Sequence, residues 1–369
     1  MLDPKDWSDI RKQGHHMLDD MFDYLQNIQS RPVWQQAPSR VQASFQCDLS
    51  EQGQSLSQLH EQFMQNILPY SVGNAHPGFM GWVHGGGTPV GMLAEMLAAG
   101  LNANLGGRNH IPIDVEWQVI GWMRDLFGFP DDSSGVLTSG TSSATVIAFI
   151  TARHAIEKLT SNNNLAVYAS LEAHGCIARA LKIMGMNPNL LRKIPCNDAY
   201  QMDIQSLKQH IQNDQQHGIQ PWLMIGTAGS VNTGAIDDLS ALADIAKTVG
   251  AWLHIDGALG ALAMLSPTIA PRLHGIEHAD SLAMDFHKWG QVPYDAGLVL
   301  IRDGEHHQQC FAAGDTYLQR ESEGLAAHSP WPCDYGMDLS RGFRALKIWF
   351  TFQHFGTKCL GNMIEHSCQ

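Results

Sequence analysis

The chain has 369 residues, of which 44% are hydrophobic and 16% charged, a composition typical of a globular protein with one large core. Its formal net charge is -13, and its 23 lysines and arginines form no basic run. Nucleic acid and anionic membranes are therefore excluded as main partners, since both need clustered positive charge. No apolar run approaches the roughly 20 residues that span a bilayer.

Cysteine and histidine usage points to a cytoplasmic protein without a metal site. Seven cysteines are an odd number and include no Cys-x-x-Cys pair, so neither a disulfide framework nor a zinc site is indicated. The first residues lack the apolar stretch of a signal peptide. The adjacent pairs His15–His16 and His306–His307 do not have the spacing of a helical metal site. The sequence therefore predicts no metal.

Two amphipathic stretches open the chain. Apolar residues recur three, four or seven positions apart over 7–28, which predicts a helix that stops before Pro32, and a second helix is expected over 56–68, ending at Pro69. Two short helices cannot bury their stripes against each other alone. Residues 1–70 are thus expected to form a helical arm that packs on another surface, such as a second subunit. The first stripe consists of Trp7, Ile10, Met17, Leu18, Met21, Leu25 and Ile28.

Glycines beside aromatic side chains mark the segment after this arm. Residues 76–82 read as a loop that lines a pocket, and His76 and Phe79 are its candidates for substrate contact. The glycine triplet at 85–87 lacks the pattern and the preceding strand of a dinucleotide fingerprint, so a Rossmann site is discounted.

The centre of the chain alternates between helix-like segments and short β-rich runs. Continuous apolar runs between helices predict buried parallel strands in an α/β sheet covered on both faces. Helices are expected over 89–102, 114–127, 142–158 and 239–249, and strands over 135–138, 165–168, 222–225, 252–255, 281–284 and 297–301.

The turn at 138–142 joins one β-run to a helix. Gly140 permits a tight turn, and the hydroxyls of Thr141 and Ser142 with the helix N–H groups make a phosphate cradle. A plain N-cap loop is the alternative. The small residues at 226–230, Thr227 among them, let a bulky ligand approach the backbone, although a tight β–α turn explains them almost as well.

Two β-runs break off on ionisable residues, as strands do where they deliver side chains to a site. The first ends in Asp256, and the second runs into Asp285-Phe286-His287-Lys288. A buried acid and an amine are what pyridoxal phosphate needs, the acid to keep its ring nitrogen protonated and the amine for a Schiff base. His174 also follows a β-run; it is either an ordinary satisfied polar residue or a group that stacks on the cofactor ring.

With these motifs in this order, from His76 to residue 349, the chain resembles the group II pyridoxal-phosphate-dependent amino-acid decarboxylases. That family includes aromatic-L-amino-acid, glutamate, histidine and diaminobutyrate decarboxylases. The resemblance implies the fold type I, aspartate-aminotransferase-like architecture, with a cofactor-binding domain at 71–345, and a homodimer with interlocking N-terminal arms and active sites at the subunit interface.

The resemblance also implies residue roles. Lys288 would form the Schiff base and Asp256 would partner the pyridinium nitrogen, with Ala258 on one face of the ring and His174 on the other. The implied reaction removes the α-carboxylate of an L-amino acid through a quinonoid intermediate. Around the phosphate the resemblance places Gly140, Thr141, Ser142 and His287, and near the ring hydroxyl or Asp256 it places Thr227.

Two departures from the family keep alternatives open. Eukaryotic members reprotonate Cα with a tyrosine on a mobile loop, but here Pro332 falls near that position and Tyr335 follows three residues later. Residues 346–369 match only the start of the family's C-terminal small domain, which suggests a truncated chain. The alternatives are an aldehyde-forming decarboxylation–deamination, or a catalytically weak homologue that acts as a structural partner.

Overall fold

A computed structural model describes residues 2–157, 164–312 and 321–369. It divides into two compact units, Met1–Trp82 and Val83–Gln369. No division falls at the expected boundary of residue 345, because the C-terminal helix α11 (Arg344–Ser367) packs against α4 and α5 inside the second unit. The first unit extends 12 residues beyond the boundary expected at residue 70.

The N-terminal unit contains the two predicted helices. Helix α1 (Trp7–Gln26) begins where the Asp6 carboxylate accepts the N–H of Ser8, and it ends before Pro32 as expected. Helix α3 (Leu56–Gln62) begins with a capping box. The short helix α2 (Ser39–Ser44) lies between them in sequence.

The second helical stretch ends slightly later than the sequence predicts. A π-helical turn (Phe63–Ile67) and a 3₁₀ turn (Leu68–Tyr70) continue α3. Pro69 was expected to end the helix, yet it lies inside the last turn. Proline is compatible with this place because the first residues of a helical turn need no N–H donor.

The second unit is built on a seven-stranded sheet, which confirms the mostly parallel α/β architecture. The strand order is β1-β7-β6-β5-β4-β2-β3. Strand β7 runs antiparallel to both of its neighbours, β1 and β6, and the other pairs are parallel. The strands are β1 (Ser134–Thr138), β2 (Leu165–Ser170), β3 (Leu191–Ile194), β4 (Gln220–Thr227), β5 (Trp252–Asp256), β6 (Ser281–Asp285) and β7 (Gly297–Ile301).

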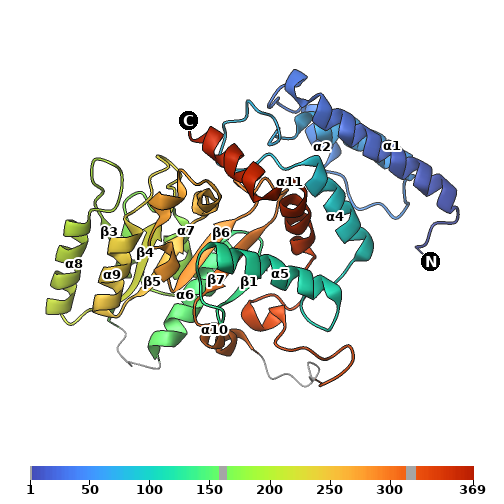
Figure 1. The fold of residues 1–369 in the computed structure, drawn as a ribbon. Coiled ribbons are helices and arrows are strands. Elements are labelled where there is room, and N and C mark those ends of the chain that lie inside the picture. The colour runs from blue at the N-terminus through green and yellow to red at the C-terminus, as the bar shows by residue number, and fades with distance from the viewer. Residues whose placement is uncertain (1, 158–163, 313–320) are drawn as a thin grey trace. The chain divides into compact units, whose positions relative to one another are not determined.

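Helices cover both faces of this sheet, as predicted (Figure 1). Apolar side chains of α5, α8, α9 and α11 pack on one face, and those of α6, α7 and α10 on the other. Helix α4 packs against α11. These helices are α4 (Pro89–Leu101), α5 (Ile111–Leu126), α6 (Thr141–Glu157), α7 (Cys176–Ile183), α8 (Ile204–Gln216), α9 (Leu239–Val249) and α10 (Gly304–Phe311).

The topology gathers strand ends at one edge of the sheet. Parallel strands deliver their carboxyl ends to the same edge, and β4, β5 and β6 end there at Thr227, Asp256 and Asp285. Thr227 lies in register with Asp256, and Asp256 with Ala283. The residues that the sequence singled out on separate runs therefore come together.

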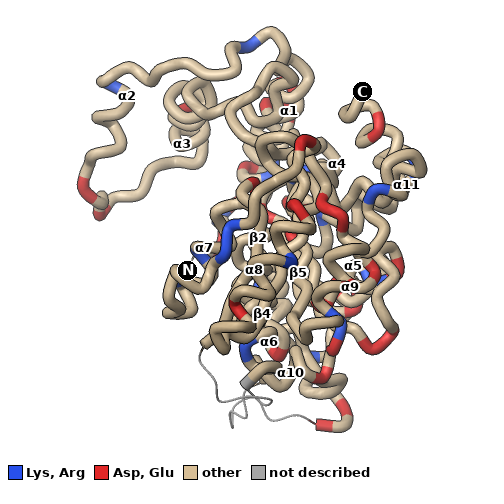
Figure 2. Tube along the Cα trace, turned by 90° about the vertical axis from the view of Figure 1, so that its left-hand side faces the viewer, with Lys and Arg blue, Asp and Glu red and all other residues tan. Residues whose placement is uncertain are grey.

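Basic residues are dispersed along the trace of the chain (Figure 2). In the portion that the structure describes, no helix combines the length and the apolar character needed to cross a bilayer.

Candidate active site

Asp256 is a carboxyl group in an apolar setting. It ends β5 and is only 4% exposed. Its Oδ1 accepts the N–H of Ala258 at 3.2 Å, and the thiol of Cys176 lies 3.7 Å from its Oδ2. Burial raises the pKa of Asp256, while the nearby charges of Lys288 and His174 act in the opposite direction. A cation placed against this carboxylate would therefore be strongly favoured.

Asp285 links the lysine to the start of a helix. Its Oδ2 lies 2.9 Å from Lys288 Nζ, and its Oδ1 accepts the N–H of Thr141 at 2.7 Å. Thr141 is the first residue of α6, where a carboxylate is favoured by the helix dipole. Asp285 was not among the predicted site residues, because its contact with Thr141 joins segments 144 residues apart and leaves no local pattern in the sequence.

His287 is held in one orientation beside this pair. Its Nδ1 accepts the N–H of Ala296 at 3.1 Å, which leaves Nε2 to carry a proton, 3.6 Å from Asp285 Oδ2. Its ring packs on that of Tyr294 with the centroids 4.5 Å apart. Burial lowers the pKa of His287, and the carboxylate of Asp285 opposes this effect. The imidazole is thus a fixed N–H donor.

The predicted phosphate cradle surrounds the N-terminus of α6. Gly140 precedes this helix, and a Cβ atom added to Gly297 would lie 2.5 Å from the Gly140 Cα, so the two glycines permit a close crossing of β7 and the turn. Ser142 is exposed. The hydroxyls of Thr141 and Thr227 are buried and have no hydrogen-bond partner among the residues described. Buried hydroxyls without partners cost stability, so a ligand that accepts from them is favoured.

His174 and Ala258 both lie near Asp256, and their places on the two faces of a ring stay a prediction of the resemblance. His174 follows β2, is exposed, and accepts the N–H of Cys176 on Nδ1 at 3.2 Å. Its charge lowers the pKa of Asp256. Ala258 is half-buried two residues beyond that carboxylate. The predicted acid, the amine and the imidazole thus belong to one site.

The glycine triplet has a role that the sequence analysis missed. Gly85 donates its N–H to the carbonyl oxygen of His287 at 2.8 Å, and a Cβ atom added to Gly85 would lie 2.1 Å from the carbonyl oxygen of Lys288. The N–H of Gly86 binds the side chain of Gln291 at 3.0 Å. These glycines let the backbone at 85–86 lie directly against the turn that contains Lys288. In the sequence, only the glycine triplet itself pointed to such a close approach.

The two substrate candidates belong to the N-terminal unit. His76 accepts the N–H of Gly78 on Nδ1 at 2.9 Å, and its Nε2 is a buried atom without a partner in the described part of the chain. Phe79 packs edge-on against Trp82, with ring centroids 4.7 Å apart. Their role in substrate binding stays a prediction.

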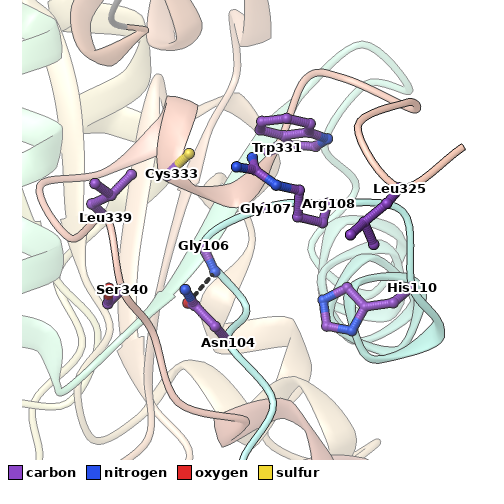
Figure 3. A pocket seen from close by; sticks show the side chains of 10 residues that line it. All are labelled: Asn104, Gly106, Gly107, Arg108, His110, Leu325, Trp331, Cys333, Leu339 and Ser340. Carbon is purple, nitrogen blue, oxygen red and sulfur yellow. Dashed lines mark hydrogen bonds between the residues drawn. The ribbon is translucent and has the colours of Figure 1, made fainter. Parts of the chain in front are cut away.

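A cavity of about 400 Å³, away from the predicted cofactor residues, lies between residues 104–110 and 325–340 (Figure 3). The Arg108 guanidinium lies 4.8 Å from the centre of the Trp331 ring. No predicted cofactor residue lines this cavity. Tyr335, the possible substitute for the loop tyrosine, is 8% exposed and packs against Trp117 and His307. It is therefore a core residue.

Comparisons with known proteins give the family that this chain resembles. A model of the pyridoxal-dependent decarboxylase conserved domain matches residues 38–369. The chain is 32% identical over 367 residues to an aromatic-L-amino-acid decarboxylase of Bacillus atrophaeus, covering 97% of this chain and 75% of the relative. A phenylacetaldehyde synthase of Arabidopsis thaliana is 26% identical, covering 99% and 77%.

Solved structures share the fold. Oryza sativa TDC with PLP and tryptamine superposes with a TM-score of 0.90 at 23% identity, covering 99% of this chain and 78% of that one. Catharanthus roseus tryptophan decarboxylase in complex with L-tryptophan superposes with a TM-score of 0.86 at 24% identity, with the same coverage of both chains.

Proposed function

The chain belongs to the pyridoxal-dependent decarboxylase family, and we propose that it removes the α-carboxylate of an aromatic L-amino acid at the site built on Asp256 and Lys288. Membership makes it a carboxy-lyase that acts on amino acids with pyridoxal phosphate as cofactor. The observation that carries the proposal is the buried Asp256 carboxyl at the same sheet edge as the Lys288–Asp285 pair.

The residues present fit the cofactor. Lys288 offers the amine that attaches it, and Asp256 offers a buried acid for its ring nitrogen. The partnerless hydroxyls of Thr141 and Thr227 offer donors. Since the N–H of Thr141 is already bound to Asp285, phosphate contacts would come from the Thr141 hydroxyl, from Ser142 and from His287 Nε2.

Three side chains of this protein would assist the reaction, each in a different way. The bound cofactor supplies an electron sink for the bond that breaks. Asp256 would keep a proton on the ring nitrogen of a bound cofactor, because separating two opposite charges in a buried setting is costly. Asp285 orients the Lys288 ammonium through their 2.9 Å contact. His174, which is exposed, would contact the substrate carboxylate.

An aromatic substrate is supported by the names of the relatives, which include aromatic-L-amino-acid, tyrosine and tryptophan decarboxylases. The test is carbon dioxide release by the purified holoenzyme with L-tryptophan, L-tyrosine, L-phenylalanine, L-histidine and L-glutamate. We expect kcat/KM to be highest for an aromatic side chain. Highest activity on L-glutamate would contradict the substrate class, and no release from any amino acid would favour a structural homologue.

Aldehyde formation is the second candidate. Tyr335 is buried in the core, Pro332 stands near the position of the family's loop tyrosine, and phenylacetaldehyde synthases are among the relatives. Product analysis separates the two reactions. Amine without oxygen uptake supports simple decarboxylation, whereas aldehyde and ammonia with oxygen uptake support the second candidate.

Gly85→Ala is expected to lower kcat about 100-fold, because a displacement of about 1 Å in a positioned group costs that much. The new methyl group would overlap the carbonyl oxygen of Lys288, so the lysine turn must shift. Gly100→Ala is the matched control, since nothing lies within 4 Å of a Cβ atom added there in helix α4. Equal kcat values for the two variants, measured on folded protein, would remove Gly85 from the site.

We also propose that the protein is a cytosolic homodimer. None of the α1 side chains is buried, and Trp7 is 66% exposed on the apolar stripe. An obligate interface buries on the order of 2,000 Å² or more, so sedimentation at micromolar concentration should give a dimer. Trp7→Glu should promote dissociation, whereas Lys12→Glu, an exposed position on the face of the helix opposite the stripe, should not. A folded wild-type monomer that still binds the cofactor would overturn the dimer.

A further inference from the structure

The N-terminal unit brings together three side chains that no part of the proposed reaction uses. His16 and Asp20 stand one turn apart on α1, and His60 comes from α3. Asp20 Oδ2 lies 3.2 Å from His60 Nε2 and 3.7 Å from His16 Nε2. The three ligand atoms all lie within 4.8 Å of one another. We propose that they bind a divalent transition-metal ion, with zinc as the best fit.

The spacing of these atoms suits zinc. Bonds of about 2.0–2.1 Å at tetrahedral angles place neighbouring ligand atoms roughly 3.3 Å apart. The two observed separations from Asp20, 3.2 and 3.7 Å, bracket that value. Two imidazoles and a carboxylate are ordinary zinc ligands. The His16 side chain is 65% exposed, so water has access to a fourth coordination position.

A neighbouring amide supports the buried ligand. His60 is 7% exposed, and its Nδ1 lies 3.1 Å from Nε2 of the Gln13 carboxamide. A flip of this carboxamide, which exchanges its nitrogen and oxygen, would let Oε1 accept a proton from Nδ1 and leave Nε2 of His60 free to bind metal. Histidine ligands are commonly oriented in this way by an acceptor on the second ring nitrogen, and carboxamide orientation and histidine tautomer adjust together.

The ion would cross-link two helices that share little core. Helix α1 has no buried side chain, and His60 is the buried residue of α3. Bonds from both helices to one ion would therefore hold α1 and α3 together. The sequence predicted no metal because it considered adjacent histidine pairs. The third ligand here comes from another helix, 40 residues beyond Asp20.

The test is zinc titration of the full-length holoenzyme after treatment with a chelator, in competition with a chromophoric chelator. His16→Ala changes an exposed residue and should leave the fold intact, while His15→Ala removes the neighbouring exposed imidazole as a matched control. We expect wild type and His15→Ala to bind one tight equivalent of zinc. In His16→Ala that equivalent should bind at least 10-fold more weakly, and Gln13→Ala should weaken it about 10-fold.

Two further readouts address the ligands and the cross-link. X-ray absorption at the zinc edge should show nitrogen and oxygen neighbours without sulfur at about 2.3 Å, which excludes the seven cysteines. Zinc should raise the melting temperature of the wild type but not that of His16→Ala. Equal zinc affinity in His16→Ala and His15→Ala, or sulfur in the first shell, would overturn the proposal without touching the decarboxylase function.

Discussion

Lys288→Ala is expected to abolish covalent attachment of the cofactor and to lower decarboxylation by several orders of magnitude, on the scale of up to about 10⁶-fold seen when a covalent catalyst is removed. The reason is where the Lys288 amine lies in the fold. Lys288 follows the end of β6, and its amine is held by Asp285 beside the start of α6. Lys347, the buried lysine of α11, already pairs with Glu95.

The measurement is borohydride reduction of the holoenzyme, followed by digestion and mass spectrometry. Wild type should carry the pyridoxyl group on the peptide that contains Lys288, and Lys288→Ala should carry none. Lys247→Ala, at an exposed position of α9, should label and turn over as wild type does. A pyridoxyl group on another wild-type lysine would show that the assignment is wrong.

Much of the fold could be read from the sequence because most of its strands are short, mainly apolar runs. All six predicted runs are strands. Four of the seven strands are buried along their whole length, and β4 and β5 are buried at every residue except the first. Strand β3 was missed because three of its four residues, including Arg192 and Lys193, are not buried. Strands that carry charged residues at a sheet edge give no continuous apolar signal.

The site was predictable only where its chemistry lies in one short segment. Asp256 and Lys288 stand at or just beyond the ends of apolar runs, so a local pattern was enough to single them out as candidates. The bond from Asp285 to Thr141 and the approach of Gly85 to Lys288 join distant segments, and no local pattern encodes them. Tyr335 shows the converse, since proximity in sequence to the expected tyrosine position did not make it a site residue.

Asp256→Asn is expected to move cofactor affinity and apo-protein stability in opposite directions. In the presence of cofactor, asparagine cannot balance a charged ring nitrogen, so affinity should fall and kcat should drop about 10²–10³-fold, the scale of one preorganised electrostatic group. Asp280→Asn is the matched control. Burial also raises the pKa of Asp280, but its carboxylate accepts the N–H of Leu253 near the opposite end of β5.

The stability of the apo-protein should rise on the same substitution. Because burial raises the pKa of Asp256 above its unfolded value, the folded chain retains a proton that the unfolded chain releases as pH rises above about 4. The carboxylate then costs stability at neutral pH, and Asp256→Asn removes that cost. The variant's apo form should melt at a higher temperature than wild type at pH 7 to 8, and the difference should vanish as pH approaches 4.

This combination separates a cofactor partner from a structural carboxylate. If Asp256 served only to stabilise the fold, its substitution would lower the stability of the protein at every pH, and the loss of activity would follow from unfolding. If Asp256 serves to bind a cation, its buried carboxylate lowers the stability of the apo-protein. Binding of the cation to that carboxylate then stabilises the holo form. Melting curves of apo and holo forms across pH 4 to 8, with kcat for both variants, make the comparison. Near-normal turnover in Asp256→Asn, or an apo form less stable than wild type at pH 7, would remove Asp256 from the proposed role.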